Sequence, residues 1–115
     1  MKIINGRVLN DNQIVNEGTT FEITLSIIGI DGNPISPSSA QYRIIDDFSG
    51  QIVRDWTSIS GSTEMTIILK DEDVAVIEGN PGEIDVRVLL FHAEYGDNKT
   101  INTEIVYGVK ALKHL

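Results

Sequence analysis

The sequence predicts an all-β sandwich, and three observations lead to this fold class. Apolar and polar residues alternate along several short stretches, as in strands that pack one face on a core. Turn-forming residues separate these stretches at intervals of roughly 8–12 residues, a spacing typical of sandwiches and barrels. No stretch sustains a helical period. We therefore expect seven to eight strands in two stacked antiparallel sheets.

Two long stretches predict a central hairpin, Glu83–Tyr95 and Thr100–Lys110, which Gly96-Asp97-Asn98 joins. Glycine, Asp and Asn tolerate the backbone angles that a tight reversal needs. Alternation predicts that one set of side chains packs on the core: Ile84, Val86, Val88 and Leu90 in the first strand, and Ile101, Thr103, Ile105, Tyr107 and Val109 in the second.

Four earlier strands are expected, over Thr19–Ile28, Ala40–Asp46, Gln51–Trp56 and Thr63–Lys70, with a weaker one over Lys2–Leu9. In Ala40–Asp46 the alternation places Tyr42 and Ile44 on the core side. In Thr63–Lys70 it places Met65, Ile67 and Leu69 there.

The segment near 71–77 predicts one short helical turn. Three acidic residues open it, where a helix N-terminus favours negative charge. Val74 and Ile77 are three residues apart, so one turn can bury both. A single turn before the last strands suits an immunoglobulin-like sandwich, in which Thr19–Ile28 and Thr63–Lys70 share one sheet while Ala40–Asp46 joins the hairpin in the other.

The chain has 115 residues, which predicts one domain over 1–115, with residues 1–18 as an N-terminal arm or an extra strand. Its net charge of −8 disfavours binding to nucleic-acid phosphates or to anionic membranes. Cysteine is absent, so disulfides and thiolate metal sites are excluded.

No signal peptide is visible after Met1, and no apolar run approaches the ~20 residues that cross a bilayer. We expect the chain to be made in the cytoplasm and to stay there, or to leave by a route other than ordinary secretion.

Catalytic residues are not expected, so we predict that the protein is not an enzyme. The histidines are His92 and His114, and no serine lies in a recognisable nucleophile turn. His92 falls on the predicted core side near a strand end, where a structural role is expected. Paired carboxylates such as Asp46 and Asp47 fall on turns and strand edges, where solvation leaves them ordinary.

No metal or other cofactor is expected. Asp31-Gly32-Asn33 and Gly96-Asp97-Asn98 could offer oxygen ligands to calcium, but neither has the ordered ligand series of a calcium-binding loop. A phosphate-binding glycine-rich loop is absent. Trp56 and Tyr42 could stack on a sugar, although both are expected in the core, so carbohydrate recognition stays open.

The hairpin breaks the alternation on its outward side, where a polar surface is expected. Its predicted outward residues include Leu89, Phe91 and Val106, and the neighbouring strand adds Ile45. Arg43 and Arg87 lie at the margin. Contiguous exposed apolar surface marks a protein interface. In the alternative interpretation, the Lys2–Val15 segment folds over this face and covers it.

Several short motifs resemble a group of small bacteriophage structural proteins with immunoglobulin-like domains, found in heads, necks, tails and baseplates. The motifs are Asn33-Pro34-Ile35-Ser36-Pro37, Tyr42-Arg43-Ile44, Ser49-Gly50, Trp56-Thr57, Val86-Arg87-Val88, Tyr95 and Tyr107-Gly108-Val109-Lys110-Ala111-Leu112. The resemblance extends from Thr19 onward.

The resemblance implies a role in assembly and brings no catalytic residues. A virion protein of this group (head decoration, neck or tail) would be made in the host cytoplasm and leave by lysis. It would bind other virion proteins and copies of itself, and it would bind neither nucleic acid nor membrane. The alternative function is a carbohydrate-binding or adhesion-type immunoglobulin-like module that uses exposed aromatic residues such as Tyr95.

Overall fold

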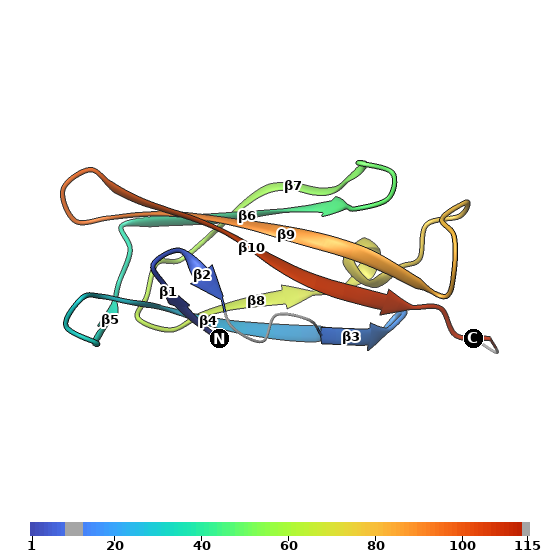
Figure 1. Ribbon diagram of the computed structural model, residues 1–115, viewed down its shortest axis with the longest axis horizontal. Coiled ribbons are helices and arrows are strands. Elements are labelled where there is room, and N and C mark those ends of the chain that lie inside the picture. The colour runs from blue at the N-terminus through green and yellow to red at the C-terminus, as the bar shows by residue number, and fades with distance from the viewer. Residues whose placement is uncertain (9–12, 114–115) are drawn as a thin grey trace.

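Two β-sheets pack face to face in the computed structural model, which describes residues 1–8 and 13–113 (Figure 1). The predicted all-β sandwich is confirmed, although the described residues form ten strands and not the seven to eight expected. The elements are β1 (Lys2–Ile4), β2 (Arg7–Val8), β3 (Gln13–Asn16), β4 (Phe21–Ile28), β5 (Pro34–Ile35), β6 (Ser39–Asp46), β7 (Ile52–Ile59), β8 (Met65–Leu69), the 3-10 helix η1 (Asp71–Val74), β9 (Ile84–Tyr95) and β10 (Lys99–Lys110).

The long hairpin is the centre of one sheet, which we call the hairpin sheet. Its strand order is β3-β10-β9-β6-β7. β9 and β10 pair along their whole length, from Tyr95 opposite Lys99 to Ile84 opposite Lys110. β6 runs antiparallel to β9 on its other side. The predicted pairing of Ala40–Asp46 with the hairpin is therefore confirmed.

The second sheet, which we call the β4 sheet, contains both β4 and β8, as predicted, and pairs them as antiparallel neighbours. β1 pairs with β4 in parallel, and β2 folds back on β1. Asn5 and Gly6 both have positive φ, 52° and 73°, so they form a tight two-residue reversal between β1 and β2.

The N-terminal segment adds strands to both sheets. β1 and β2 lie at one edge of the β4 sheet, and β3 runs parallel to β10 at the edge of the hairpin sheet. Both sheets are therefore mixed, which the expected antiparallel arrangement did not include. The described parts of Lys2–Val15 lengthen sheet edges, and Gly6 borders the outer surface beside Trp56 and Leu90. Residues 9–12 lie outside the described residues.

The side chains between the two sheets form one apolar core. β4 and β8 contribute Ile23, Leu25, Ile27, Met65, Ile67 and Leu69 from one side; β6, β9 and β10 contribute Tyr42, Ile44, Leu89, Phe91, Ala93, Ile105, Tyr107 and Val109 from the other. The predicted core residues of β6, β8 and β10 are confirmed, except that Ile101 is only half-buried and Thr103 is a buried polar residue.

The predicted orientation of β9 is wrong. Leu89 and Phe91 are buried in the core, while Val86 and Val88 face away from it. The register explains this result, because core residues Tyr42 and Ile44 of β6 lie opposite Phe91 and Leu89. β9 carries apolar residues on both faces, so apolar alternation alone could not choose between them.

A buried ion pair also belongs to the core side. Arg87, which was predicted to lie at an exposed margin, is completely buried opposite Asp46 of β6. Its Nε donates to Asp46 Oδ1 at 3.2 Å. Its Nη2 donates to Asp85 Oδ2 at 3.1 Å and to the Ala75 carbonyl at 2.6 Å. Its Nη1 donates to the Asp73 carbonyl at 3.2 Å.

Asp46 is itself held by several donors. The Ser49 backbone N–H and hydroxyl donate to its Oδ2 at 2.9 and 2.7 Å. The Asn80 amide donates to both carboxylate oxygens at 3.0 Å. Burial by itself raises the pKa of Asp46, but these hydrogen bonds outweigh burial and leave the pKa below its ordinary value of 3.8.

Arg87 also ties η1 to the hairpin sheet; Figure 1 shows η1 behind β9 in this view. The buried Asp73 carboxylate accepts the Lys70 N–H at 3.1 Å and Arg54 Nε at 2.8 Å. The Tyr107 hydroxyl donates to the Asp73 carbonyl at 2.7 Å. The predicted helical turn is thus present, although it is shorter than 71–77.

Replacing Arg87 with Ala is expected to lower the free energy of unfolding by about 3–5 kcal/mol, because Asp46 and Asp85 would stay buried without their cation. Urea denaturation measures this change. Arg7→Ala removes an exposed arginine of β2 and should cost less than about 0.5 kcal/mol. Equal effects of the two substitutions would contradict the assigned role of Arg87.

Acid should destabilise the fold through Asp46. Its folded-state pKa is lowered, so its contribution is complete above the unfolded value of 3.8 and is lost as pH falls through the lower folded-state pKa. We expect Asp46→Asn to be less stable than the wild type at pH 7 and to show a shallower loss of unfolding free energy below about pH 4. Urea titrations at several pH values provide the comparison, and an unchanged acid slope would exclude this contribution.

Candidate functional site

The outward surface of the hairpin sheet, which we call the outer face, carries a row of apolar side chains. Ile45 lies opposite Ile52 of β7 and opposite Val88 of β9, and Val88 lies opposite Val106 of β10. Residues directly opposite each other in a sheet point to the same side. One apolar row therefore crosses four strands, where a solvent-facing surface would be polar.

Neighbouring rows extend this apolar surface. Leu90 of β9 lies between Arg43 and Glu104, and Val86 lies opposite Gly108, which in turn pairs with Ile14 of β3. Val86 and Ile14 are 40% and 63% exposed. We call the combined surface the apolar patch; it consists of Ile14, Ile45, Ile52, Trp56, Ile84, Val86, Val88, Leu90 and Val106.

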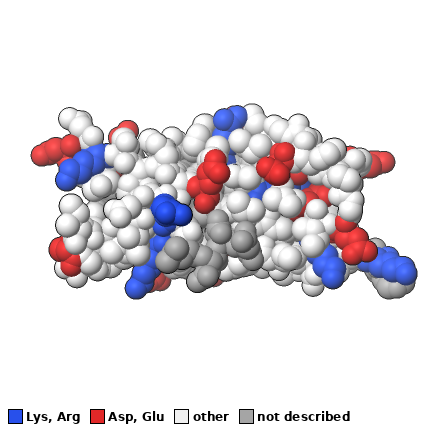
Figure 2. Space-filling model, in the orientation of Figure 1, with Lys and Arg blue, Asp and Glu red and all other residues white. Residues whose placement is uncertain are grey.

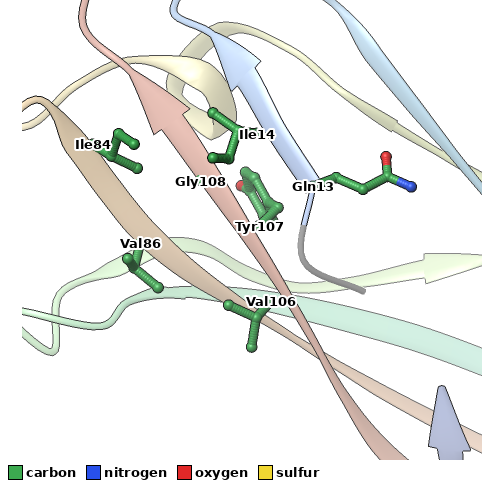
Figure 3. Close-up of a pocket in the computed structure, with 7 residues that line it drawn as sticks. All are labelled: Gln13, Ile14, Ile84, Val86, Val106, Tyr107 and Gly108. Atoms are coloured by element: carbon green, nitrogen blue, oxygen red, sulfur yellow. The ribbon is translucent and has the colours of Figure 1, made fainter. Parts of the chain in front are cut away.

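A hollow of about 200 Å³ lies in the apolar patch at Gly108. Figure 3 shows Ile14 and Ile84 on either side of Gly108, with Val86 and Val106 farther along the strands. A Cβ atom at Gly108 would lie 2.8 Å from Cγ2 of Ile84, so the hollow depends on glycine. We call it the Gly108 hollow. Its size and lining suit one apolar side chain.

Charged groups border the patch, and Arg43 lies between the patch residues Leu90 and Trp56. The Arg43 guanidinium lies 5.9 Å from the centre of the Trp56 ring. The Nε of Arg43 is 3.5 Å from the Asp55 carboxylate, which is too long for a good hydrogen bond. Figure 2 shows charged residues scattered over the side of the molecule where β10 lies in front, with uncharged surface between them. A partner that binds here would contact both the apolar side chains and the Arg43 guanidinium, which lacks a good hydrogen bond.

The residues predicted for the interface divide into two groups. Arg43, Ile45 and Val106 do lie on the outer face. The placement of Arg87, Leu89 and Phe91 there is wrong, because all three are buried. The sequence analysis missed the outward residues of β9.

One signal could have identified the outward side of β9. Tyr42, Ile44 and Asp46 occupy alternate positions of one strand, so Asp46 lies on the core side with the other two. A carboxylate buried there needs a cation as its partner. Arg87 supplies this cation. Leu89 and Phe91 follow it at alternate positions of β9, so they lie on the core side as well.

Two other sequence predictions need correction. His92 is half-buried on the outer face, with Nδ1 2.6 Å from Asn102 Oδ1, and not on the core side. Trp56 is 44% exposed and not in the core, whereas Tyr42 is buried as expected.

The two loops considered for calcium lie at the same end of the molecule in Figure 1 but belong to different sheets. Asp31 accepts hydrogen bonds from the backbone and the side chain of Asn33, and these lower the pKa of its carboxyl. Across residues 1–8 and 13–113, no cluster of three or more acidic or histidine side chains could hold a metal.

In the same residues, no helix has the length and hydrophobicity to span a membrane.

Comparison with known proteins supports the fold. No family model matches the chain, and no curated protein matches its sequence. Among solved structures, it is similar to the N-terminal domain of phage TP901-1 ORF48, with a TM-score of 0.51 and 10% sequence identity. The similarity covers 97% of this chain and 95% of that one, so the two share an architecture over nearly their whole lengths.

Asp substitutions on either side of β9 test the assigned orientation. Leu89→Asp is expected to abolish cooperative folding, because it buries an unpaired carboxylate. Val86→Asp should fold and lose no more than about 1 kcal/mol, because Val86 faces solvent. Circular dichroism with thermal denaturation distinguishes the two variants, and the reverse order of stability would contradict the structure.

Proposed function

We propose that this protein is a non-enzymatic structural component of a bacteriophage particle, in head decoration, neck or tail, and that it acts through protein–protein contacts. The observation that carries this proposal is the apolar patch, an exposed surface that soluble chains seldom keep without a partner. The architecture shared with a phage protein domain supports the phage origin.

We further infer that the sandwich is immunoglobulin-like. Two features support this inference: β4 pairs with β8 in one sheet, and β6 joins the β9–β10 hairpin in the other. η1 connects the two sheets between β8 and β9. In the known fold of this type, a short connection also crosses between the sheets before the last two strands.

The non-enzymatic part of the proposal is supported by the roles of the buried ionisable groups. Asp46 and Asp85 are paired with Arg87, and the Asp73 carboxylate caps η1 and pairs with Arg54. The Asp46–Arg87 pair holds β6 to β9 and the Asp73–Arg54 pair holds η1 to β7, whereas Asp85 pairs with Arg87 within β9. None of these carboxylates is left free for acid–base chemistry.

The extent of the apolar patch across the sheet supports a contact of standard size. A standard interface buries about 800 Å² on each partner, a little over a tenth of the 6953 Å² surface of this chain. The patch extends over all five strands of the hairpin sheet, from Ile52 on β7 to Ile14 on β3.

Carbohydrate recognition remains the second candidate, because Trp56 is exposed. Its ring lies beside Arg43, and an aromatic ring with a neighbouring cation can stack on a sugar. Glycan binding that Trp56→Ala removes would favour this function over assembly.

Purified phage particles provide the direct test. Mass spectrometry is expected to find the protein in them, and electron microscopy should locate it at a symmetric position. Val86→Asp should fold but fail to be incorporated, because a charge in the patch opposes burial in an interface. Ile68→Asp, at an exposed site on β8 in the β4 sheet, is the matched control and should be incorporated normally. Incorporation of both variants would exclude this face as the contact.

A further inference from the structure

We infer that the outer face pairs with the same face of a second copy of this chain, and that Phe48 of each copy fills the Gly108 hollow of the other. This inference rests on the proposed function, because it assigns a partner to the apolar patch. It comes from the positions of charged and apolar groups on either side of β9.

β9 lies in the middle of the hairpin sheet, with β6 and β7 on one side and β10 and β3 on the other. A two-fold axis that runs along β9 between two facing sheets exchanges these sides. It places β6 of one copy over β10 of the second. Such an arrangement is stable only if the β6 side and the β10 side complement each other, since every contact then occurs twice.

The charges satisfy this condition. Arg43 of β6 and Glu104 of β10 both lie opposite Leu90, so they occupy the same row at equal positions on either side of β9. The two-fold axis places Arg43 of each copy opposite Glu104 of the other. Opposite charges therefore meet twice at one edge of the apolar surface.

A second reciprocal pair lies at the other edge. Asp47 donates its backbone N–H to the Val86 carbonyl at 2.9 Å, so it lies beside Val86 on the β6 side. Lys110 pairs with Ile84 on the β10 side, two residues farther along β9. The two-fold axis brings Asp47 near Lys110 of the second copy, within reach of the long lysine side chain.

The shapes of the two sides also match, because the β6 side carries a protruding side chain and the β10 side carries a hollow. Phe48 follows Asp47 in the β6–β7 turn, is 66% exposed, and lies beside Ile84 and Val86. The Gly108 hollow is on the β10 side of the same two residues. The axis therefore places the ring of Phe48 over the hollow of the second copy. A cavity of about 150 Å³ accommodates benzene, so a hollow of about 200 Å³ accepts a phenyl ring.

The net charge of −8 makes copies repel one another in general. Pairing requires a local surface that overcomes this repulsion, and the outer face combines an apolar centre with two reciprocal pairs of opposite charge. A partner of different sequence would not need Arg43 and Glu104 at equivalent positions. The arrangement therefore favours a second copy.

Charge exchange tests the pairing in the purified protein. We expect the wild type to form a dimer in sedimentation equilibrium. Arg43→Glu alone and Glu104→Arg alone should each raise the dissociation constant at least about tenfold, because like charges then meet. The double variant should restore the dimer. A mixture of the two single variants should form a heterodimer, since the mixture again brings opposite charges together.

The Phe48 side chain and the Gly108 hollow are tested separately from the charges. Phe48→Ala should raise the dissociation constant at least about tenfold, as expected for an aromatic anchor. Gly108→Ala should do the same, because its Cβ would lie 2.8 Å from Cγ2 of Ile84 and would displace that side chain, which changes the hollow. Ile30→Ala is the matched control, because Ile30 is also apolar and is more exposed than Phe48, but it lies in the β4–β5 loop, away from the patch.

A wild-type protein that stays monomeric at all accessible concentrations would overturn the inference. So would a double charge variant that remains monomeric although circular dichroism shows it to be folded. If Val86→Asp still lost incorporation into particles in that case, the proposed function would stand and the patch would bind a different protein.

Discussion

The buried pair between Arg87 and Asp46 is the interaction on which the rest of the structure depends. The two residues lie directly opposite each other on β9 and β6, and both side chains are fully buried. A shift of one residue in register would turn every side chain of β9 to the other sheet surface. It would also expose Leu89 and Phe91 and leave Asp46 buried without a cation. The ion pair thus specifies the register, a use for which buried polar contacts are well suited.

This constraint explains why the outer face is apolar. β9 alternates two apolar sets, and the set that includes Leu89 and Phe91 is on the same side as Arg87. Once Arg87 is directed to Asp46, Val86, Val88 and Leu90 must face outward. Strands buried on both faces have this composition. The sequence of β9 is therefore typical of a strand that is buried on both faces, and this composition is the basis for the proposed contact.

Much of the architecture could be predicted from the sequence, because it follows from local patterns. The alternation in β4, β6 and β8 and the Gly96-Asp97-Asn98 turn are short-range signals. The orientation of β9 was not predicted, since charged residues at 85 and 87 are usually assigned to solvent. Arg87 is neutralised inside by Asp46 of β6, a long-range contact that the local pattern of β9 does not contain. The exposure of Trp56 was missed for a related reason: bulges in the pairing of β6 and β7 shift the alternation along β7.

Thiol labelling along β9 tests the central claim most directly, because the chain contains no cysteine of its own. Single cysteines would be placed at positions 86, 88, 89, 90 and 91, and their reaction with a thiol reagent followed in dilute native protein. Cysteines at 86, 88 and 90 are expected to react quickly, and those at 89 and 91 only after unfolding. The opposite pattern, or protection at all five positions, would contradict the orientation that the Arg87–Asp46 pair imposes.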